Sequence, residues 1–388
     1  MCSLLVSCAR FPDVPVLSGA ETASPALLTD TVDLPTLTVS PSATALPSTN
    51  TAIPPTPTPS PIPSETPTPT ATLPPPEGFN TKLLRPGTLP QEYIPDACEY
   101  LRLRWSPEGS PPGTVVVPIM FHGIFRRENN VTAAQDISQK QFEDFITYAR
   151  YLGYETISTD QLLGFLEGNS RIPPRSMIMI FDDRRLGTIR EHVLPVLNEF
   201  DWHATVAYIT GPVVPEKEWE DLVDLVKTGK VDVQAHGYLH NGETYITDFT
   251  PVDVIKQEIY GAYSVIGERF GTPPISFIWP GGNFNELAVK MAREAGYRLG
   301  FTIKSHGPVM FNWIPQGEEE RMLGDPLMLL PRTWSYEANF KLDQATQFAE
   351  QARQFAIQNY PSEAAWYRST CGGELPKLGE IIPDIPVP

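Results

Sequence analysis

Short apolar runs and longer amphipathic segments alternate along the chain from residue 114 onward. An apolar run of about 4–8 residues is typical of a buried strand, whereas apolar residues spaced three or four apart are typical of one face of a helix. The sequence therefore predicts strands and helices that follow one another in turn. The predicted strands cover residues 114–121, 154–158, 177–183, 204–209, 231–235, 275–279 and 298–303.

Helix-start signals lie between these strands. The predicted caps are Ser138 with Gln141 and Thr188 with Glu191, which have capping-box spacing, and the single residues Thr159 and Asn285. Further amphipathic segments cover 219–227, 251–270 and 336–354. Alternation of this kind favours parallel strands joined by crossover helices, wound as a (β/α) barrel or as an open sheet.

The predicted strand at 177–183 ends in two adjacent carboxylates, Asp182 and Asp183. Two neighbouring anions repel each other, and a metal ion can relieve the repulsion by binding one and leaving the other free as a base. In a (β/α) barrel the chemistry is carried by the carboxyl ends of the strands. The other polar or aromatic residues at predicted strand ends are His122, His236 and the pair Trp279-Pro280.

A second histidine, His240, follows His236 by four positions. On a helical turn this spacing places both imidazoles on one face, where they can bind one ion. Together with Asp183 they would form a three-ligand site that keeps open positions for water. These nitrogen and oxygen donors suit Zn²⁺, and cobalt, nickel or iron would fit as well.

Four segments of residues 114–370 resemble the motifs of polysaccharide deacetylases of the NodB-homology type (carbohydrate esterase 4). Phe181-Asp182-Asp183 is similar to the first motif, His236 to His240 to the His-x-x-x-His second motif, and Phe277-Ile278-Trp279-Pro280-Gly281-Gly282 to the third. Pro118-Ile119-Met120-Phe121-His122, followed by Gly123-Ile124, resembles the Met-Tyr-His strand of the poly-N-acetylglucosamine deacetylase-like branch. The resemblance implies an α/β fold, a distorted (β/α) barrel of the NodB-homology type.

The resemblance also implies roles for single residues. Asp183, His236 and His240 would bind a divalent metal such as Zn²⁺, and Asp182 would be the general base that activates water. The backbone N–H of Gly281 would help to hold the oxyanion formed from an acetamide carbonyl. His122 is the candidate general acid. The residues expected to contact substrate are Arg184, Tyr238, Trp279, Pro280 and Arg332, and Arg332 is also a candidate to orient Asp182.

Some positions depart from the family pattern. Arg184 stands where the family has Gly, so it would narrow the cleft or pair with a carboxylate on the substrate. Ile278 and Gly281 replace an Arg and a Tyr of the chitin-deacetylase form, and a Leu-His fifth motif is missing from the sequence.

The sequence leaves two functions open. The first is an extracellular, metal-dependent enzyme that removes N-acetyl or O-acetyl groups from a polysaccharide such as poly-N-acetylglucosamine, a chitin-like polymer or peptidoglycan. The second is a non-catalytic, glycan-binding descendant of such an enzyme on the cell surface.

The segments that flank this region differ from it in composition. Residues 11–90 are rich in Pro, Thr and Ser and are expected to form a disordered, extended stalk. Before them, Leu5-Val6-Ser7-Cys8 resembles the lipobox of bacterial lipoproteins, so residues 1–10 would be a truncated lipoprotein signal and Cys8 a lipid anchor to a membrane. The catalytic domain is expected at residues 91–371, and the Pro-rich residues 372–388 are expected to form a loose tail.

Charge and cysteine content narrow the setting. The net charge of −17 argues against nucleic acid as a partner, because a phosphate backbone would be repelled. Cys98 and Cys371 lie near the two ends of the expected domain, so a bridge between them would join its termini. Such a bridge needs an oxidising compartment, which agrees with an extracellular or cell-surface location. The sequence alone does not decide whether the two cysteines are bonded.

Overall fold

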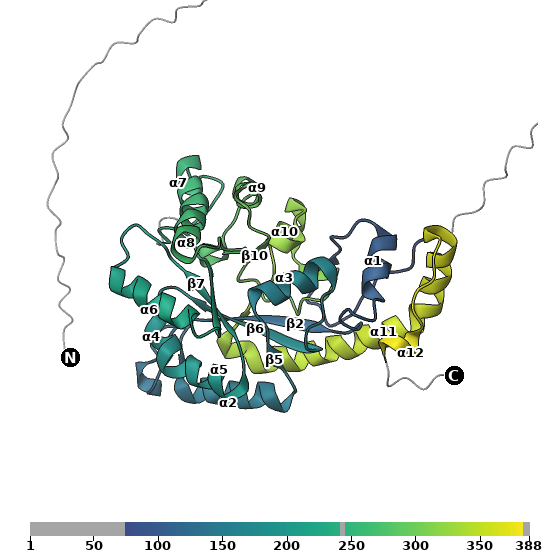
Figure 1. Cartoon of the computed structure of the whole chain (residues 1–388), viewed down its shortest axis with the longest axis horizontal. Coiled ribbons are helices and arrows are strands. Elements are labelled where there is room, and N and C mark those ends of the chain that lie inside the picture. Colours follow the sequence, from purple (N-terminus) through teal and green to yellow (C-terminus); the bar gives the residue numbers. More distant parts are fainter. Residues whose placement is uncertain (1–73, 241–244, 383–388) are drawn as a thin grey trace, which may run out of the picture. The chain divides into compact units, whose positions relative to one another are not determined.

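The central sheet contains eight parallel strands in a computed structural model that describes residues 74–240 and 245–382 (Figure 1). Its order is β10-β9-β8-β7-β6-β2-β12, and β5 lies beside the start of β6. The strands are β2 (Val115–Phe121), β5 (Glu155–Thr156), β6 (Arg175–Asp182), β7 (Ala204–Tyr208), β8 (Val231–Ala235), β9 (Ser276–Ile278), β10 (Leu299–Phe301) and β12 (Thr333–Trp334). Every strand predicted from the sequence is present. The predictions for residues 1–73, including Cys8 and most of the stalk, lie outside the described residues.

The sheet closes on itself through a single short link between β10 and the segment before β12. The N–H of Leu330 donates to the carbonyl of Gly300 at 2.8 Å, and the N–H of Thr302 donates to the carbonyl of Leu330 at 2.9 Å. A Cβ on Gly300 would lie only 2.1 Å from the carbonyl oxygen of Met328, so this approach requires glycine. The fold is therefore a distorted (β/α) barrel, as the family resemblance implied.

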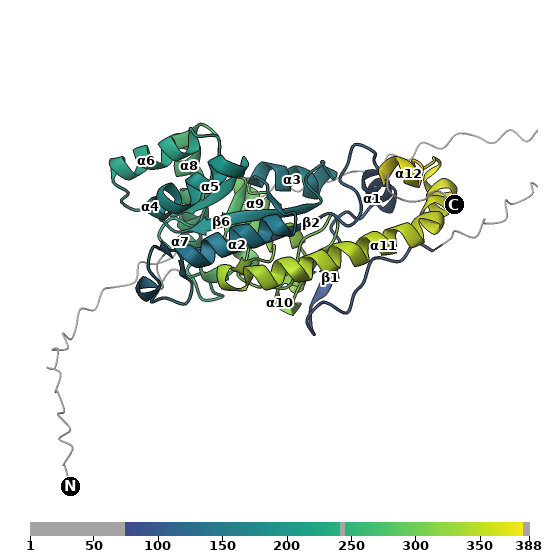
Figure 2. The ribbon, with the colours of Figure 1, turned by 90° about the horizontal axis from the view of Figure 1, so that it is seen from below.

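Most of the helices in the described part of the chain surround the barrel. Their bounds are α1 (Ala97–Arg104), α2 (Gln139–Tyr151), α3 (Thr159–Gly168), α4 (Leu186–Thr188), α5 (Leu194–Phe200), α6 (Glu216–Val226), α7 (Val252–Lys256), α8 (Ala262–Phe270), α9 (Glu286–Ala295), α10 (Glu318–Leu323), α11 (Ala338–Cys371) and α12 (Leu378–Ile381). π-helical turns at Ile189–Val193 and Gln257–Gly261 join α4 to α5 and α7 to α8. Figure 2 shows α2 and α11 side by side along one flank of the sheet.

The predicted caps are partly confirmed. Ser138 and Gln141 form the expected capping box of α2, and Asn285 caps α9. The cap of α3 is Ser158 rather than Thr159, because the hydroxyl of Thr159 points into the barrel. The expected capping box at Thr188 is wrong: the helix already begins at Leu186, so Thr188 is inside it and makes no capping hydrogen bond.

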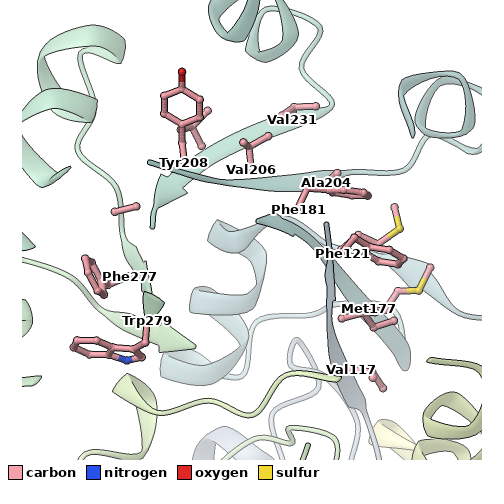
Figure 3. Close-up of a cluster of buried hydrophobic side chains, with 14 of the residues drawn as sticks. Val117, Phe121, Met177, Phe181, Ala204, Val206, Tyr208, Val231, Phe277 and Trp279 are labelled. Carbon is pink, nitrogen blue, oxygen red and sulfur yellow. The ribbon is translucent and has the colours of Figure 1, made fainter. Parts of the chain in front are cut away.

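Alternation along the strands separates two cores. Odd-numbered positions of β2, β6 and β8 face the surrounding helices and contribute Phe121, Phe181 and Val231 to the cluster in Figure 3. Even-numbered positions such as Val116, Ile178 and Ile180 fill the interior of the barrel. Because side chains alternate along a strand, the even-numbered residues at the ends of β2, β6 and β8 also point into the barrel.

The ordered domain extends beyond both expected boundaries. On the amino-terminal side, β1 (Leu89–Gln91) pairs antiparallel with β11 (Ile314–Gln316), so these residues are part of the fold rather than of the stalk. On the carboxyl-terminal side, the tail expected to be loose is packed as far as Ile382, with Leu375, Ile381 and Ile382 buried. The compositional signal failed here because Pro-rich segments can still bury a few apolar side chains.

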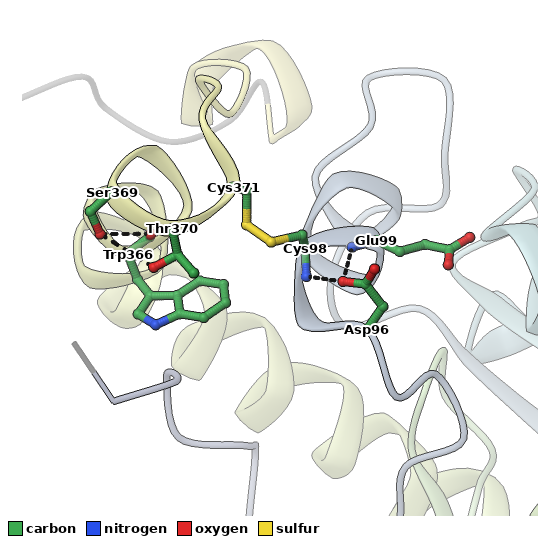
Figure 4. The surroundings of a disulfide bond; sticks show 7 residues. All are labelled: Asp96, Cys98, Glu99, Trp366, Ser369, Thr370 and Cys371. Atoms are coloured by element: carbon green, nitrogen blue, oxygen red, sulfur yellow. Dashed lines mark hydrogen bonds between the residues drawn. A yellow bond between two sulfur atoms is a disulfide. The ribbon is translucent and has the colours of Figure 1, made fainter. Parts of the chain in front are cut away.

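A disulfide joins Cys98 in α1 to Cys371 at the end of α11, with the two Cα atoms 5.7 Å apart (Figure 4). Helix α11 runs 17 residues further than the predicted end at 354. Its last part packs against α1 through Trp105 and Trp366, in a small cluster separate from the barrel. The structure thus decides what the sequence left open: the two cysteines are bonded and join the two ends of the domain.

Candidate functional site

Three strand ends converge on one cavity of about 260 Å³. His122 follows β2, Asp182 ends β6 and His236 follows β8; each occupies an even-numbered position and so points into the barrel. The cavity is lined by His122, Gln135, Asp182, Asp183, His236, His240, Tyr245, Gly281, Ile303, Arg332 and Trp334. The structure thus brings together seven residues that the sequence singled out for metal binding, catalysis or the orientation of Asp182.

Asp183, His236 and His240 form a group that could hold a metal ion. One potential ligand atom from each residue lies within 4.8 Å of the other two, and Asp183 Oδ1 is 3.9 Å from His236 Nε2. Ligand bonds of about 2.0–2.1 Å place two donors of one ion at most about 4 Å apart, so closure around an ion needs only a small adjustment. Two imidazoles and a carboxylate fit a zinc-like ion in chemistry as well as in spacing.

His236 is fixed in a state that can bind a cation. Its Nδ1 lies 2.8 Å from the carbonyl oxygen of Ile278, so Nδ1 carries the proton and Nε2 keeps its lone pair toward Asp183. Burial lowers the pKa of His236 to about 4, and the charge of the nearby Asp182, which acts to raise it, does not outweigh this. The imidazole is therefore neutral at pH 7.

The backbone around the group is strained at two of the three residues. Asp183 has φ +69° and His240 has φ +37°, values that side chains other than glycine rarely adopt. Such conformations cost on the order of 1–3 kcal/mol and persist only where the surrounding structure holds them. The residue with left-handed backbone after β6 is Asp183 itself, so Arg184 occupies the position of the family's Gly without needing a positive φ.

Asp182 is buried, 2% exposed, and is paired with Arg332, which is 1% exposed. Nη1 of Arg332 donates to Asp182 Oδ1 at 2.6 Å, and Nε donates to the carbonyl of Thr302. Burial alone would raise the pKa of Asp182, but the charge of Arg332, together with the two nearby histidines, outweighs this and lowers it to about 2. The carboxylate is therefore ionised at neutral pH, and its Oδ2 faces His122 and His236 at 3.9 and 3.8 Å.

His122 and Arg332 each present a buried nitrogen without a partner among the described residues. These atoms are Nδ1 of His122 and Nη2 of Arg332. The ring of His122 lies almost parallel to that of Trp334, with centroids 6.0 Å apart. Buried polar atoms that lack a hydrogen-bonding partner destabilise a fold. These two nitrogens are therefore available to bind a molecule or water in the cavity.

Four predicted substrate contacts do not face the cavity. Arg184 Nε lies 3.7 Å from Glu218 Oε1. The ring of Tyr238 packs against Gly211 and Gly261. Trp279 is 0% exposed because its odd-numbered position faces outward, and its Nε1 donates to the carbonyl of Met328. Pro280, the next residue, is buried as well. Trp279 therefore cannot stack on a sugar ring in this conformation, and Tyr238, which is half-buried, does not line the cavity.

Gln135, Tyr245 and Ile303 line the cavity without a signal in the sequence. Gln135 and Tyr245 belong to irregular segments, and Ile303 follows β10. Tyr245 packs edge-on against His240, with centroids 5.7 Å apart. Only the strand-end position of Ile303 could have indicated its place.

Comparison with known proteins gives matches over part of the chain. Residues 169–300 match a family model described as polysaccharide deacetylase. The poly-β-1,6-N-acetyl-D-glucosamine N-deacetylase of Escherichia coli O157:H7 is 20% identical over 198 residues, which are 41% of this chain and 29% of that protein. The chain thus spans less than a third of the length of this relative. The resemblance seen in the motifs is confirmed.

Comparison with solved structures also gives matches of low sequence identity over part of the chain. Streptococcus pyogenes deacetylase PplD in complex with acetate aligns at 18% identity with a TM-score of 0.48, covering 60% of this chain and 98% of that one. IcaB from Ammonifex degensii aligns at 19% identity with a TM-score of 0.47, covering 61% and 97%.

Proposed function

We propose that this chain, whose residues 169–300 match the polysaccharide deacetylase family, is a metal-dependent hydrolase that removes acetyl groups from a polysaccharide. The observation that carries the proposal is the convergence of Asp183, His236 and His240 beside the ionised Asp182 in one cavity. A buried carboxylate next to a three-donor group is the arrangement that metal-assisted hydrolysis needs.

A bound divalent ion, with Zn²⁺ the best fit to these donors, would act as a Lewis acid on an acetamide carbonyl and on water. Asp182 accepts the proton of the attacking water through Oδ2, because Oδ1 is held by Arg332. Arg332 keeps this carboxylate ionised and fixes its orientation.

The cavity also supplies groups for the later part of the reaction. Gly281 lines the cavity with φ +59°, and its N–H is the proposed donor to the oxygen of the tetrahedral centre. His122 Nε2 lies 3.9 Å from Asp182 Oδ2, and His122 is the proposed acid that protonates the departing amine. Trp334, whose ring lies next to that of His122, is the aromatic side chain best placed to contact a sugar ring.

The proposed substrate is an acetylated polysaccharide of the poly-N-acetylglucosamine, chitin or peptidoglycan type, and the proposed location is outside the cytoplasm. The E. coli relative's name, which specifies poly-β-1,6-N-acetyl-D-glucosamine, supports the first part. The bond between Cys98 and Cys371 supports the second, because disulfides persist in oxidising compartments. No helix in residues 74–240 and 245–382 is long and apolar enough to cross a membrane. A lipid anchor at Cys8 is part of the same proposal.

The test is acetate release from poly-N-acetylglucosamine, chitin oligomers, peptidoglycan and acetylxylan. We expect the zinc-loaded protein to release acetate from at least one polymer, and Asp182→Asn to reduce the rate by about 10²–10⁴-fold because the base is lost. Asp232→Asn is the matched control, since Asp232 lies at the other end of the barrel. Equal background release by wild type and Asp182→Asn would favour a glycan-binding protein without catalysis.

A further inference from the structure

Glu258 is a buried carboxylate that no step of the proposed reaction uses. It is 0% exposed, and its oxygens accept hydrogen bonds from the backbone N–H groups of Tyr238 at 2.8 Å and Leu239 at 2.9 Å. The N–H of His240 lies 3.5 Å from the same carboxylate. A single acidic side chain thus binds three successive amides of the segment that ends in a candidate metal ligand.

The local backbone is shaped to receive this carboxylate. Gly237 has φ +83°, and a Cβ there would lie 2.3 Å from Glu258 Oε2, so only glycine leaves room for the contact. Successive N–H groups that point to one side form a concave site for an anion, and here the anion belongs to the protein itself. Burial raises the pKa of Glu258 by disfavouring its charged form, and the hydrogen bonds from the three amides work against this by favouring the carboxylate.

The helix that carries Glu258 is itself irregular at this point. Glu258 lies in the π-helical turn Gln257–Gly261, between α7 and α8. π-turns in otherwise α-helical segments occur often at functional sites. The same turn places Gly261 against the ring of Tyr238, so one turn of helix holds both the amides and the side chain of the segment.

We propose that Glu258 is a positioning residue that fixes His240 at bonding distance from the ion shared with Asp183 and His236. This inference rests on the proposed function, because it assumes that the three residues bind a metal. A metal ligand must be placed to within about ±0.2 Å. The backbone of His240 is strained, with φ +37°, so it needs support from its surroundings to hold that position. Glu258 supplies the hydrogen bonds that keep this backbone in place.

The direct test is Glu258→Gln, with metal affinity as the readout. The amide group turns an N–H₂ donor toward backbone N–H donors, so at least one bond is replaced by repulsion. We expect the dissociation constant for Co²⁺, measured through the visible absorption of the bound ion, to rise by about 10–100-fold. Bound Co²⁺ should also show an altered spectrum, because the geometry of His240 changes.

Glu363→Gln is the matched control. Glu363 is 1% exposed and accepts a hydrogen bond from Trp105 Nε1 in the cluster formed by α1 and α11, away from the cavity. Both substitutions remove a buried carboxylate and should lower the melting temperature of the metal-free protein. Only Glu258→Gln should weaken Co²⁺ binding; equal affinities in Glu258→Gln and wild type, or an equal loss in Glu363→Gln, overturn the proposal.

Failure of the proposed function gives a different result from failure of this inference. If wild type binds Co²⁺ but releases no acetate, hydrolysis fails while the role of Glu258 is still decided by the affinities. A wild type that binds no Co²⁺ overturns both. Should Glu258→Gln not fold, amide hydrogen exchange of the wild type decides: slow exchange at Tyr238 and Leu239 supports the contacts, and exchange at the rate of free loops overturns them.

Discussion

The two ends of the barrel carry the same kinds of side chains but use them in opposite ways. At the amino ends of the strands, Asp232 is surrounded by protein groups that use all of its hydrogen-bonding capacity. These partners are Thr159 at 2.8 Å, Thr205 at 3.0 Å, His203 at 2.9 Å and Gln234 at 3.0 Å. At the carboxyl ends, Asp182 and Asp183 face a cavity, and the carboxylate–imidazole distances there are 3.8–3.9 Å.

The two ends differ in how much space lies between the carboxylate and the imidazole. At the amino end, His203 and Asp232 are 2.9 Å apart, which is a direct hydrogen bond with no room for an ion between them. At the carboxyl end, the potential metal-ligand atoms of His236 and Asp183 are 3.9 Å apart, which leaves room for a cation. The carboxyl end also retains unpartnered nitrogens on His122 and Arg332. A closed network of polar groups stabilises the fold, and an open one is available for binding.

Exchanging histidines for alanine at the two ends gives the largest contrast. His240→Ala should lose bound zinc and reduce acetate release to background, because only two donors remain. His203→Ala should keep zinc and activity but unfold at a lower temperature, since Asp232 loses a hydrogen-bonding partner. Metal content, acetate release and thermal unfolding of both variants make the check. A His203→Ala protein that loses its zinc would contradict the separation of the two ends.

Arg332 makes a direct ion pair at the otherwise open carboxyl end of the barrel, and its partner, Asp182, is the proposed base. Arg332→Lys keeps the charge, but a single ammonium cannot reach both the carbonyl of Thr302 and Asp182 as the guanidinium does. We expect kcat to fall by about 10–100-fold with KM and zinc content unchanged, because the base is misoriented while the ligands stay in place. Steady-state kinetics with metal analysis measures this, and a change in KM alone would show that Arg332 contacts the substrate instead.

The sequence revealed most of the fold and the main part of the site, for reasons that the structure makes clear. Strand ends are local features, so His122, Asp182 and His236 could be placed at one rim without knowing the contacts between strands. Alternation within β9 would also have shown that Trp279 faces outward, because Ile278 takes the interior position.

Contacts between distant segments explain what the sequence did not show. Glu258 has the appearance of an ordinary surface residue in a helix, since its partners are amides 18 to 20 positions away. Closure of the barrel by Leu330 depends on two hydrogen bonds to another segment rather than on a strand pattern. The extension of α11 beyond residue 354 depends on its packing against α1.

The smallest effect on activity, and a clear effect on stability, is expected from Asp232→Asn. Burial works to raise the pKa of Asp232, but its hydrogen bond with His203 and those from Gln234 and Thr159 outweigh this and lower it. A carboxyl group whose pKa is lower in the folded than in the unfolded state stabilises the fold above its unfolded pKa of about 3.9. That stabilisation disappears as the pH falls through the folded pKa.

We therefore expect Asp232→Asn to lower the free energy of unfolding by about 1–3 kcal/mol at pH 7, because an amide cannot accept all four hydrogen bonds. The difference from wild type should stay constant down to about pH 5 and shrink below about pH 4, where Asp232 takes up a proton in the unfolded wild type before it does so in the folded protein. Urea unfolding at a series of pH values measures this, with acetate release at pH 7 unchanged. A difference that is independent of pH down to pH 2 would mean that the stabilisation comes from the shape of the side chain rather than from its charge, and the amino end would then be closed by packing alone.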